Sequence, residues 1–382
     1  MKSESELAGV YVHIPFCISR CSYCDFATEI YRDPAFVDRY VKAVCSEIYT
    51  ARLNSSSRQH QINTIYFGGG TPSLLSPNQL EQILNAVDNR FVLDESNLEI
   101  TLEINPATVS AERLRDFRSL GINRASFGVQ TFNERLLKTL SRRHTAEDAL
   151  QTFRLLRASG YDNVSLDLIV GLPRQTLRGW QADIQKALNL RPEHLSLYIL
   201  EVHENTPLAQ QISSGRQPPP DDSLTAKMYE LIIEKLSSAG YQQYEISNFS
   251  LPGFQSKHNL KYWKCLPVFG FGVSAFSFCD TERWSNERNT ARYVELIENG
   301  RSPVVFREQV NLASEYAFLG LRLSEGIQLS EYKRRFGFAL EEKFSAEIEQ
   351  FQNLGLIEIR DGYLRLTSKG FLYSNEVFAI FV

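Results

Sequence analysis

The sequence YVHIPFCISRCSYCDF, at Tyr11–Phe26, joins an apolar, β-branched segment to a cluster of cysteines. Three of the six cysteines in the 382-residue chain, Cys17, Cys21 and Cys24, fall within eight residues of each other. Clustered thiols in so long a chain indicate a metal site rather than a disulfide framework. Thiolates bind iron–sulfur clusters, usually four to a cluster. Three thiolates therefore predict a [4Fe–4S] cluster with one iron open to an outside ligand.

A zinc site is the alternative, with His13 as a fourth ligand. The second C-x2-C pair of many structural zinc sites is missing, and His13 lies only four residues before Cys17, so the pattern favours the iron–sulfur cluster. The other cysteines, Cys45, Cys265 and Cys279, are scattered, and we expect each to be a small buried side chain.

The composition indicates a soluble globular protein, with 43% apolar and 23% charged residues. The net charge of −4 argues against a broad nucleic-acid-binding surface, which needs clustered Lys and Arg. No segment approaches the roughly 20 apolar residues of a membrane span. The N-terminal residues MKSESELAGVYVHIPF lack a long apolar core, so we expect no secretory signal and a cytoplasmic location.

Six β-branched runs alternate with helix-length segments over the first half of the chain. The predicted strands are Val10–Ile14, Ile62–Phe67, Leu98–Ile104, Ile122–Gly128, Val164–Val170 and Leu195–Leu200. Such alternation implies parallel strands with right-handed crossovers. Six units are too few for a closed eight-stranded barrel. We therefore predict an α/β fold with an open, partial (β/α)6 barrel, and a doubly wound sheet is the alternative.

Several helix starts carry clear capping signals. Asp33 before Pro34 begins a predicted helix Pro34–Leu53, which has an apolar stripe at spacings of three and four. Ser76 with Gln79 forms a capping box. Thr145 with Asp148 marks another start, for a helix that ends at Gly160.

The second half of the chain changes character. Gly215–Asp222 is a Pro-rich loop, and from about residue 308 we predict helices at 312–323, 330–336 and 340–353, then a hairpin around Asp361-Gly362 and a last helix. This pattern predicts a small winged-helix-like α+β domain, which lacks the basic stripe of a DNA-binding one. The predicted domains are residues 1–215, 216–307 and 308–382.

Five segments in order carry a resemblance to a known family: YVHIPFC, FGGGTP, LEINP, SFGVQTF and SLDLIVGLP. The spacing C-x3-C-x2-C, with an aromatic residue before the last cysteine, is the radical SAM signature. The chain resembles the HemN/HemW branch of that superfamily, and most closely the HemW heme chaperones, over essentially its whole length. The resemblance implies that S-adenosylmethionine chelates the open iron, and that the reduced cluster can cleave it to a 5′-deoxyadenosyl radical.

Polar and glycine residues at the predicted strand ends form the candidate cofactor site. Glycines allow close approach of backbone to a ligand, although Gly68–Pro72 also suits a tight turn between strand and helix. The carboxylate of Glu103, at a strand end, can bind an amino group or ribose. The charge of Asp167 lies within an apolar run and is costly to bury unless it is paired. The resemblance assigns Gly69, Gly70 and Thr71 to the methionyl end of the ligand. It assigns Tyr11, Glu103, Gln130, Arg142 and Asp167 to S-adenosylmethionine as well, with Arg143 as the alternative to Arg142.

Two histidines have two interpretations each. His13 faces the same side as Tyr11 and is either a residue that supports the cluster or a hydrogen-bonded core histidine. His258 begins HNLKYW, a block typical of the HemW group, and is a candidate axial ligand of heme. The alternative is a structural turn in which Asn259 bonds the backbone and Trp263 fills the core. Cys265 is a weaker candidate for an axial ligand.

The resemblance leaves three functions open. The first is heme binding and delivery to client hemoproteins, the second is oxygen-independent coproporphyrinogen III oxidation, and the third is radical SAM methyl transfer. The oxidases carry a fourth cysteine two residues after the third, where this chain has Phe26, and a longer N-terminal extension, where this chain has sixteen residues before Cys17. HNLKYW also favours the chaperone, and enzymatic activity stays open. The resemblance further implies an electron donor such as flavodoxin or ferredoxin, a homodimer, and peripheral membrane association.

Overall fold

The structure is a computed structural model that describes residues 7–51 and 60–381. The first six residues of the N-terminal segment lie outside the described residues, as does Leu53, the predicted end of the first helix.

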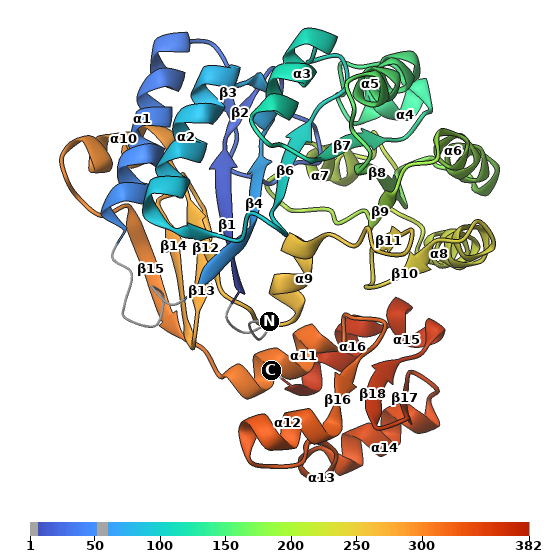
Figure 1. The fold of residues 1–382 in the computed structure, drawn as a ribbon. Coiled ribbons are helices and arrows are strands. Elements are labelled where there is room, and N and C mark those ends of the chain that lie inside the picture. The colour runs from blue at the N-terminus through green and yellow to red at the C-terminus, as the bar shows by residue number, and fades with distance from the viewer. Residues whose placement is uncertain (1–6, 52–59, 382) are drawn as a thin grey trace.

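Seven neighbouring strands of the main sheet run parallel (Figure 1). In spatial order they are β9 (His194–Ile199), β8 (Val164–Val170), β7 (Arg124–Gln130), β6 (Glu99–Ile104), β4 (Gln61–Gly69), β1 (Leu7–Ile14) and β12 (Val268–Phe271). The first six neighbours follow the order of the chain, without the reversal that a doubly wound sheet requires. The result confirms the predicted partial barrel and excludes the doubly wound alternative.

The barrel stays open because antiparallel strands flank the parallel run. On one side lie β11 (Asn248–Ser250) and β10 (Gln242–Gln243), and on the other β13 (Phe276–Cys279), β14 (Glu282–Asn286) and β15 (Val304–Gln309). A short strand β5 (Val92–Leu93) pairs with β4 off this path. All six predicted strands are present, but β12 was not predicted, because it is only four residues long and lies far along the chain from its partner β1.

The helices that connect the strands lie on the outer side of the sheet (Figure 1). They are α1 (Pro34–Thr50), α2 (Pro77–Arg90), α3 (Ala111–Ser119), α4 (Glu134–Thr139), α5 (Ala146–Ala158), α6 (Leu177–Leu190) and α8 (Asp222–Ser238). The predicted caps are confirmed. The Asp33 carboxylate accepts from the N–H of Ala35 at 2.9 Å, and the Ser76 and Thr145 capping boxes are both complete.

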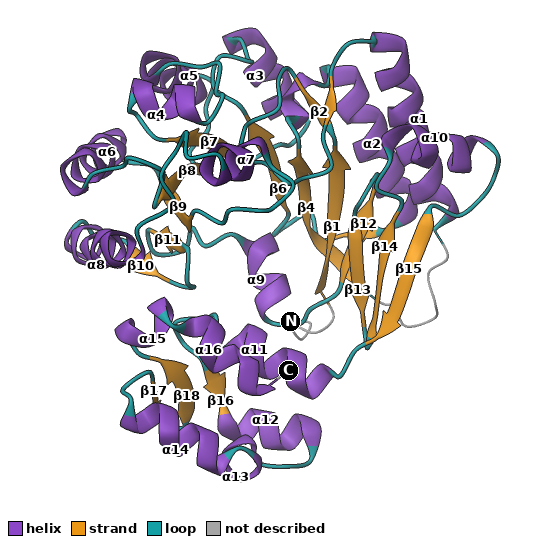
Figure 2. Cartoon of the chain, turned by 180° about the vertical axis from the view of Figure 1, so that it is seen from behind, coloured by secondary structure: helices purple, strands orange, loops and turns teal. Residues whose placement is uncertain are grey.

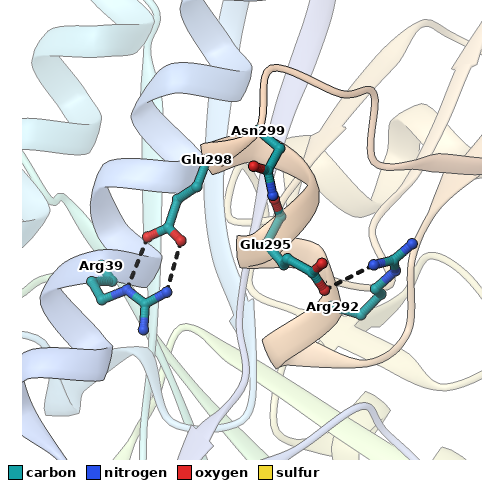
Figure 3. Close-up of polar contacts among 5 residues, drawn as sticks. All are labelled: Arg39, Arg292, Glu295, Glu298 and Asn299. Carbon is teal, nitrogen blue, oxygen red and sulfur yellow. Dashed lines mark hydrogen bonds and ion pairs between the residues drawn. The ribbon is translucent and has the colours of Figure 1, made fainter.

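Helix α10 (Thr290–Glu298) packs against α1 beside the β13–β15 ribbon. Figure 3 shows the Arg39 guanidinium of α1 donating to both carboxylate oxygens of Glu298, at 2.9 and 2.7 Å. A second pair in that view, Arg292 with Glu295, lies within α10. Both pairs are exposed, so solvent screens them and each contributes little to the stability of the fold.

The C-terminal region forms a small α+β domain, as predicted (Figure 2). Its helices are α11 (Leu312–Gly320), α12 (Leu329–Phe336), α13 (Leu340–Lys343), α14 (Ser345–Asn353), α15 (Ser368–Leu372), α16 (Ser374–Phe378) and η4 (Ala379–Phe381). Its sheet has the order β16 (Ile327–Gln328), β18 (Tyr363–Leu366), β17 (Ile357–Arg360). The predicted hairpin turns at Asp361 and Gly362, with φ of 51° and 81°. The predicted helix 340–353 is interrupted at Phe344, where φ is −114°.

This domain lies below the amino ends of the parallel strands, next to α9 (Lys257–Trp263) (Figure 1). The Arg322 guanidinium lies 4.2 Å from the centre of the Trp263 ring and 3.7 Å from the buried Glu245 carboxylate. The opposite end of the barrel, at the carboxyl ends of the strands, is therefore left open. Among the helices of the described residues, none combines the length and apolarity needed to cross a bilayer.

Candidate functional site

A cavity of about 810 Å³ opens at the carboxyl ends of the parallel strands. Ends of neighbouring parallel strands meet at one edge of a barrel, which brings side chains from distant segments together. Ten of the twelve residues predicted to bind the cluster or a cofactor line this cavity. They are Tyr11, Cys17, Cys21, Cys24, Gly69, Gly70, Glu103, Gln130, Arg142 and Asp167. The other two, Thr71 and His258, do not line it.

The cysteine loop is held at this cavity by three neighbouring elements. It leaves β2 (Phe16–Cys17), which pairs with β3 (Glu29–Ile30). The N–H of Ser22 donates to the carbonyl of Leu140 after α4 at 3.0 Å. The carbonyl of Ser22 accepts from the N–H of Leu208, at the start of α7 (Pro207–Ser213), at 2.8 Å. The backbone around Cys21 is thus anchored on both sides.

Polar groups also reach the cysteine sulfurs. The Thr71 hydroxyl lies 3.7 Å from Cys17 Sγ, and Arg142 Nη1 lies 3.5 Å from Cys21 Sγ. Burial raises the pKa of the Cys17 thiol to about 11, and binding of a metal must displace that proton. Thr71 lines a smaller hollow beside the cysteine loop and not the main cavity.

The geometry does not support the zinc alternative. Within the described residues, His60, Cys279 and Asp280 form a group of three potential ligands whose atoms all lie within 4.8 Å of one another, and the cysteine loop forms no such group. His13 is also engaged: its Nε2–H donates to the carbonyl of Ala27 at 2.9 Å, and its Nδ1 accepts from the Tyr11 hydroxyl at 3.0 Å. Burial lowers the His13 pKa to about 4, so the ring is neutral. His13 thus braces the cysteine loop through Ala27, and the three thiols beside an open cavity fit a [4Fe–4S] cluster.

The glycine segment brings the end of β4 close to the cysteine loop. Gly69 has φ of +109°, and a Cβ there would lie 2.6 Å from the His13 ring. A Cβ on Gly70 would lie 2.6 Å from the carbonyl oxygen of Pro15. The N–H groups of Gly69, Gly70 and Thr71 donate within the protein, to Glu103, Ile14 and Phe16. The segment therefore satisfies the tight-turn interpretation, and its glycines are required by the close approach of the chains.

Two buried carboxyl groups form the polar wall of the cavity. The Glu103 carboxylate accepts from the Tyr66 hydroxyl at 2.8 Å and from the N–H of Gly69 at 3.0 Å. Burial, and then the nearby Asp167 carboxylate, raise the Glu103 pKa to about 7. Burial also raises the Asp167 pKa, although the Ser126 hydroxyl lies 3.4 Å away. Such a wall suits a cationic ligand, whose charge compensates the cost of burying carboxylates.

Arg142, not its neighbour Arg143, points into this cavity. Its guanidinium donates to Asn105 Oδ1 at 2.9 Å and to the carbonyl of Gly128 at 2.6 Å. Arg143 is exposed and lines a smaller hollow of about 110 Å³ behind the cysteine loop. Gln130 reaches the cavity from a bulge in β7, where its φ is 67°.

His258 lies in the floor of the barrel, beneath the cavity. Its side chain is buried, Nδ1 is hydrogen-bonded to the Thr64 hydroxyl at 2.9 Å, and Nε2 to the Tyr262 hydroxyl at 3.1 Å. With both nitrogens engaged, the geometry favours the structural interpretation of HNLKYW over the axial-ligand one. Within it, Ser256 rather than Asn259 provides the side-chain cap of α9. Cys265 and Cys279 are buried and Cys45 is partly buried, as expected.

Apolar side chains that line the cavity were not predicted from the sequence. Exposed side chains of Tyr198, Ile199, Tyr262 and Phe276 line the cavity together with Phe26, which was noted only for the cysteine that it replaces. Tyr198 and Ile199 lie near the end of the predicted strand Leu195–Leu200, where two adjacent large apolar residues are a weak signal. Nothing in the sequence around Phe276 marks it.

Comparisons with known proteins agree with this site. The family model of the radical SAM superfamily matches residues 11–187, and that of the HemN C-terminal domain matches residues 309–373. The heme chaperone HemW of Bacillus subtilis is 37% identical, over 98% of this chain and 99% of that protein. HemW of Haemophilus influenzae is 33% identical, over 98% and 97%.

A mitochondrial relative and one solved structure extend these matches. Radical S-adenosyl methionine domain-containing protein 1 of Bos taurus is 34% identical, over 96% of this chain and 85% of that protein. The structure of coproporphyrinogen III oxidase HemN from Escherichia coli superposes with a TM-score of 0.85 over 98% of this chain and 90% of HemN, at 21% identity. At that identity the likeness shows a shared fold.

Proposed function

The chain belongs to the HemW family of radical SAM proteins, and from this membership we propose that it is a heme chaperone that holds a [4Fe–4S] cluster and S-adenosylmethionine. The relatives that carry the name heme chaperone align along almost their full length with this chain. A match of that extent covers the cysteine loop, the cavity and the C-terminal domain together.

The observation that supports the proposal most directly is one cavity lined by both the three thiols and the polar strand ends. Cys17, Cys21 and Cys24 would hold the cluster, whose fourth iron would face the cavity. When bound and reduced, a cluster of this kind supplies an electron that can cleave S-adenosylmethionine.

The residues of this chain would bind and orient that ligand. Glu103 and Asp167 would face its positively charged groups, and Gln130 offers both a donor and an acceptor. Arg142 would bind its carboxylate, since an Arg pairs with a carboxylate through two hydrogen bonds. Tyr11 would keep His13 in the tautomer that holds Ala27, and through it the cysteine loop.

The oxidase alternative receives no support from the shared fold, because one fold hosts many functions. The residue at the position of the fourth cysteine of the oxidases is Phe26, whose side chain is 65% exposed at the cavity. A phenyl ring can neither donate nor accept a proton. This difference favours heme handling over porphyrin decarboxylation, and nothing in the cavity favours the methyltransferase alternative.

Two assays on the same reconstituted protein test the proposal. We expect heme to bind with a defined stoichiometry in an absorption titration. We expect no vinyl product from coproporphyrinogen III in the presence of S-adenosylmethionine and a low-potential reductant. Formation of the vinyl product, or absence of saturable heme binding, would overturn the proposed function.

We also propose that an acidic electron-transfer protein, of the flavodoxin or ferredoxin type, reduces the cluster. Exposed cations surround the cysteine loop in a chain of net charge −4. Arg20 precedes Cys21, Arg143 lines the hollow behind it, and Lys138 lies on the helix that anchors the loop. Opposite charge on a partner would steer it to this face.

Domain boundaries, partners, location and oligomeric state are part of the same proposal. We propose domains at residues 1–215, 216–307 and 308–382, and the match of the HemN C-terminal model to residues 309–373 supports the last boundary. We propose client hemoproteins as partners, a cytoplasmic location and a homodimer, on the basis of the family resemblance.

A further inference from the structure

Exposed apolar side chains gather at one place on this protein. Of the thirteen large apolar side chains that are exposed in the described part of the chain, five line the cofactor cavity. They are Phe26 at 65% exposure, Phe276 at 55%, Tyr198 at 43%, Ile199 at 40% and Tyr262 at 37%. Scattered exposed apolar residues need no explanation, whereas a contiguous group marks a binding surface.

The five side chains come from four separate parts of the chain. Phe26 lies in the cysteine loop, Tyr198 and Ile199 at the end of β9, Tyr262 on α9 and Phe276 at the start of β13. The two ends of the parallel run, at β9 and at β12 with its neighbour β13, thus both supply apolar groups to the same cavity. We call the four of these side chains on the cysteine loop, β9 and β13 the apolar rim; Tyr262 reaches the cavity from the floor, where its hydroxyl is hydrogen-bonded to His258.

The cavity is therefore divided by chemistry. Its polar part carries the thiols, Glu103 and Asp167, and suits the charged cofactor, while the side chains of the apolar rim are partly exposed. A volume of about 810 Å³ lies toward the upper end of the range for small-molecule sites. A second, flat and apolar ligand would cover the rim and shield the inner wall from water.

Charged and ligating groups stand at the edge of the same mouth. Arg20 and Arg288 line the cavity and are exposed, and Arg288 donates to the carbonyl oxygen of Asp25 at 2.6 Å. His203 also lines the mouth, with its side chain 47% exposed. Guanidinium groups bind carboxylates, and an accessible imidazole can bind iron.

We propose that heme binds across the apolar rim, with the macrocycle against Phe26 and Phe276 and the propionates toward Arg20 and Arg288. Heme matches this mouth because it is planar and apolar over both faces and carries two carboxylates on one edge. This inference rests on the proposed chaperone function and assigns its cargo a site. The site lies on the solvent side of the cofactor and does not use the engaged imidazole of His258.

The placement also explains how the cargo could be released. A ligand on the rim keeps one edge or face toward solvent, so a client protein can reach it without opening the barrel. Phe26 acquires a role of its own in this arrangement, because an aromatic ring stacks on a porphyrin where a thiol does not.

Heme titration of the holoprotein with cluster and S-adenosylmethionine tests the site. We expect Phe26→Ala and Phe276→Ala each to weaken heme binding about tenfold, since each removes an aromatic contact with the macrocycle. Phe26→Trp should retain affinity. The matched control is Tyr373→Ala, an aromatic side chain 47% exposed in the C-terminal domain, which should bind heme as the parent does.

Iron content and S-adenosylmethionine affinity, measured on every variant, show whether the cavity is intact. If the parent protein binds heme and both alanine variants bind it equally tightly with intact clusters, the site inference is overturned and the chaperone function stands. If the parent protein binds no heme, the proposed function itself fails. Equal losses in the two rim variants and in Tyr373→Ala would also contradict a local site.

Discussion

The two ends of the barrel use the same kinds of side chain in opposite ways. At the open end, the mouth carries Glu103, His203 and exposed aromatic rings around a cavity. At the floor, the centre of the His258 ring lies 5.1 Å from that of Tyr66, and the backbone N–H of His258 donates to the Glu99 carboxylate at 3.2 Å. The floor is closed by α9 and the C-terminal domain (Figure 1), and the cavity lies at the other end of the barrel.

Hydrogen bonding explains the difference between the two ends. A buried polar group is stable only when its partners come from the protein, as they do for His258. At the open end, Glu103 also has protein partners, in Tyr66 and Gly69, but its side chain lines the cavity, where a ligand can reach it. Function is therefore expected where polar groups line an accessible cavity, not simply where they are found.

The largest effect should come from the cysteine loop. Replacement of Cys17, Cys21 or Cys24 by Ala should each abolish the cluster, because each thiolate holds one iron. The buried Cys265, replaced by Ala, should retain it. The measurement is iron and acid-labile sulfide per chain after anaerobic reconstitution. About one zinc per chain without sulfide would instead revive the zinc alternative.

Substitutions in the floor should change the stability of the protein rather than its binding of the cluster or of heme. His258→Ala should lower the free energy of unfolding by about 2–3 kcal/mol, because it leaves Thr64 and Tyr262 unpaired and opens a void. His203→Ala, at the mouth, should change it by less than about 0.5 kcal/mol. Denaturant unfolding measures both. A loss of heme affinity in a stable His258→Ala protein would show that the floor histidine serves the cargo after all.

The smallest expected effect concerns pH: the affinity for S-adenosylmethionine should depend on Glu103 at the open end and not on His258 at the floor. Glu103 has a pKa of about 7, raised by burial, so it is ionised above that pH and protonated below it. A cationic ligand needs the ionised form, and S-adenosylmethionine affinity should fall roughly tenfold from pH 8 to pH 6. Calorimetric titration measures this affinity, and for Glu103→Gln it should be the same from pH 6 to pH 8.

The floor histidine, His258, should not contribute to the pH dependence of S-adenosylmethionine affinity. Burial lowers the pKa of His258 to about 3, so its ring is neutral throughout this range. A steep profile that persists in Glu103→Gln would assign the titration to another group.

Local patterns predicted the elements of this fold well. Strands such as Val164–Val170 were found by their β-branched runs, and the Ser76 and Thr145 caps by their spacing, because these signals act between residues a few positions apart. The interruption of the predicted helix 340–353 at Phe344 and the strand β12 were not predicted, since neither has a local signal. The pairing of β12 with β1 joins residues more than 250 positions apart.

The sequence predicted which residues form the site better than it predicted how they are arranged. The positions of Glu103 and Gln130 at or next to the ends of their strands were enough to place them near the cysteines, since parallel strands end at one edge. Asp167 lies in the middle of β8, and its charge within an apolar run was the signal. Which of Arg142 and Arg143 enters the cavity was left open, because adjacent residues after a helix can point either way. The same limit applied to His258, whose hydrogen-bond partners come from β4 and its own helix.

The sequence by itself determined that three thiolates, a strand-rich barrel and a set of polar strand ends occur in this chain, because spacing and periodicity are properties of neighbouring residues. Only the tertiary structure decided which groups are satisfied and which are left facing a cavity. Phe26, Tyr198 and Phe276 became one surface because the open barrel brings the cysteine loop, β9 and β13 to the same mouth. Hydrogen-bond satisfaction and exposure depend on residues far apart in the chain, and folding alone brings those residues together.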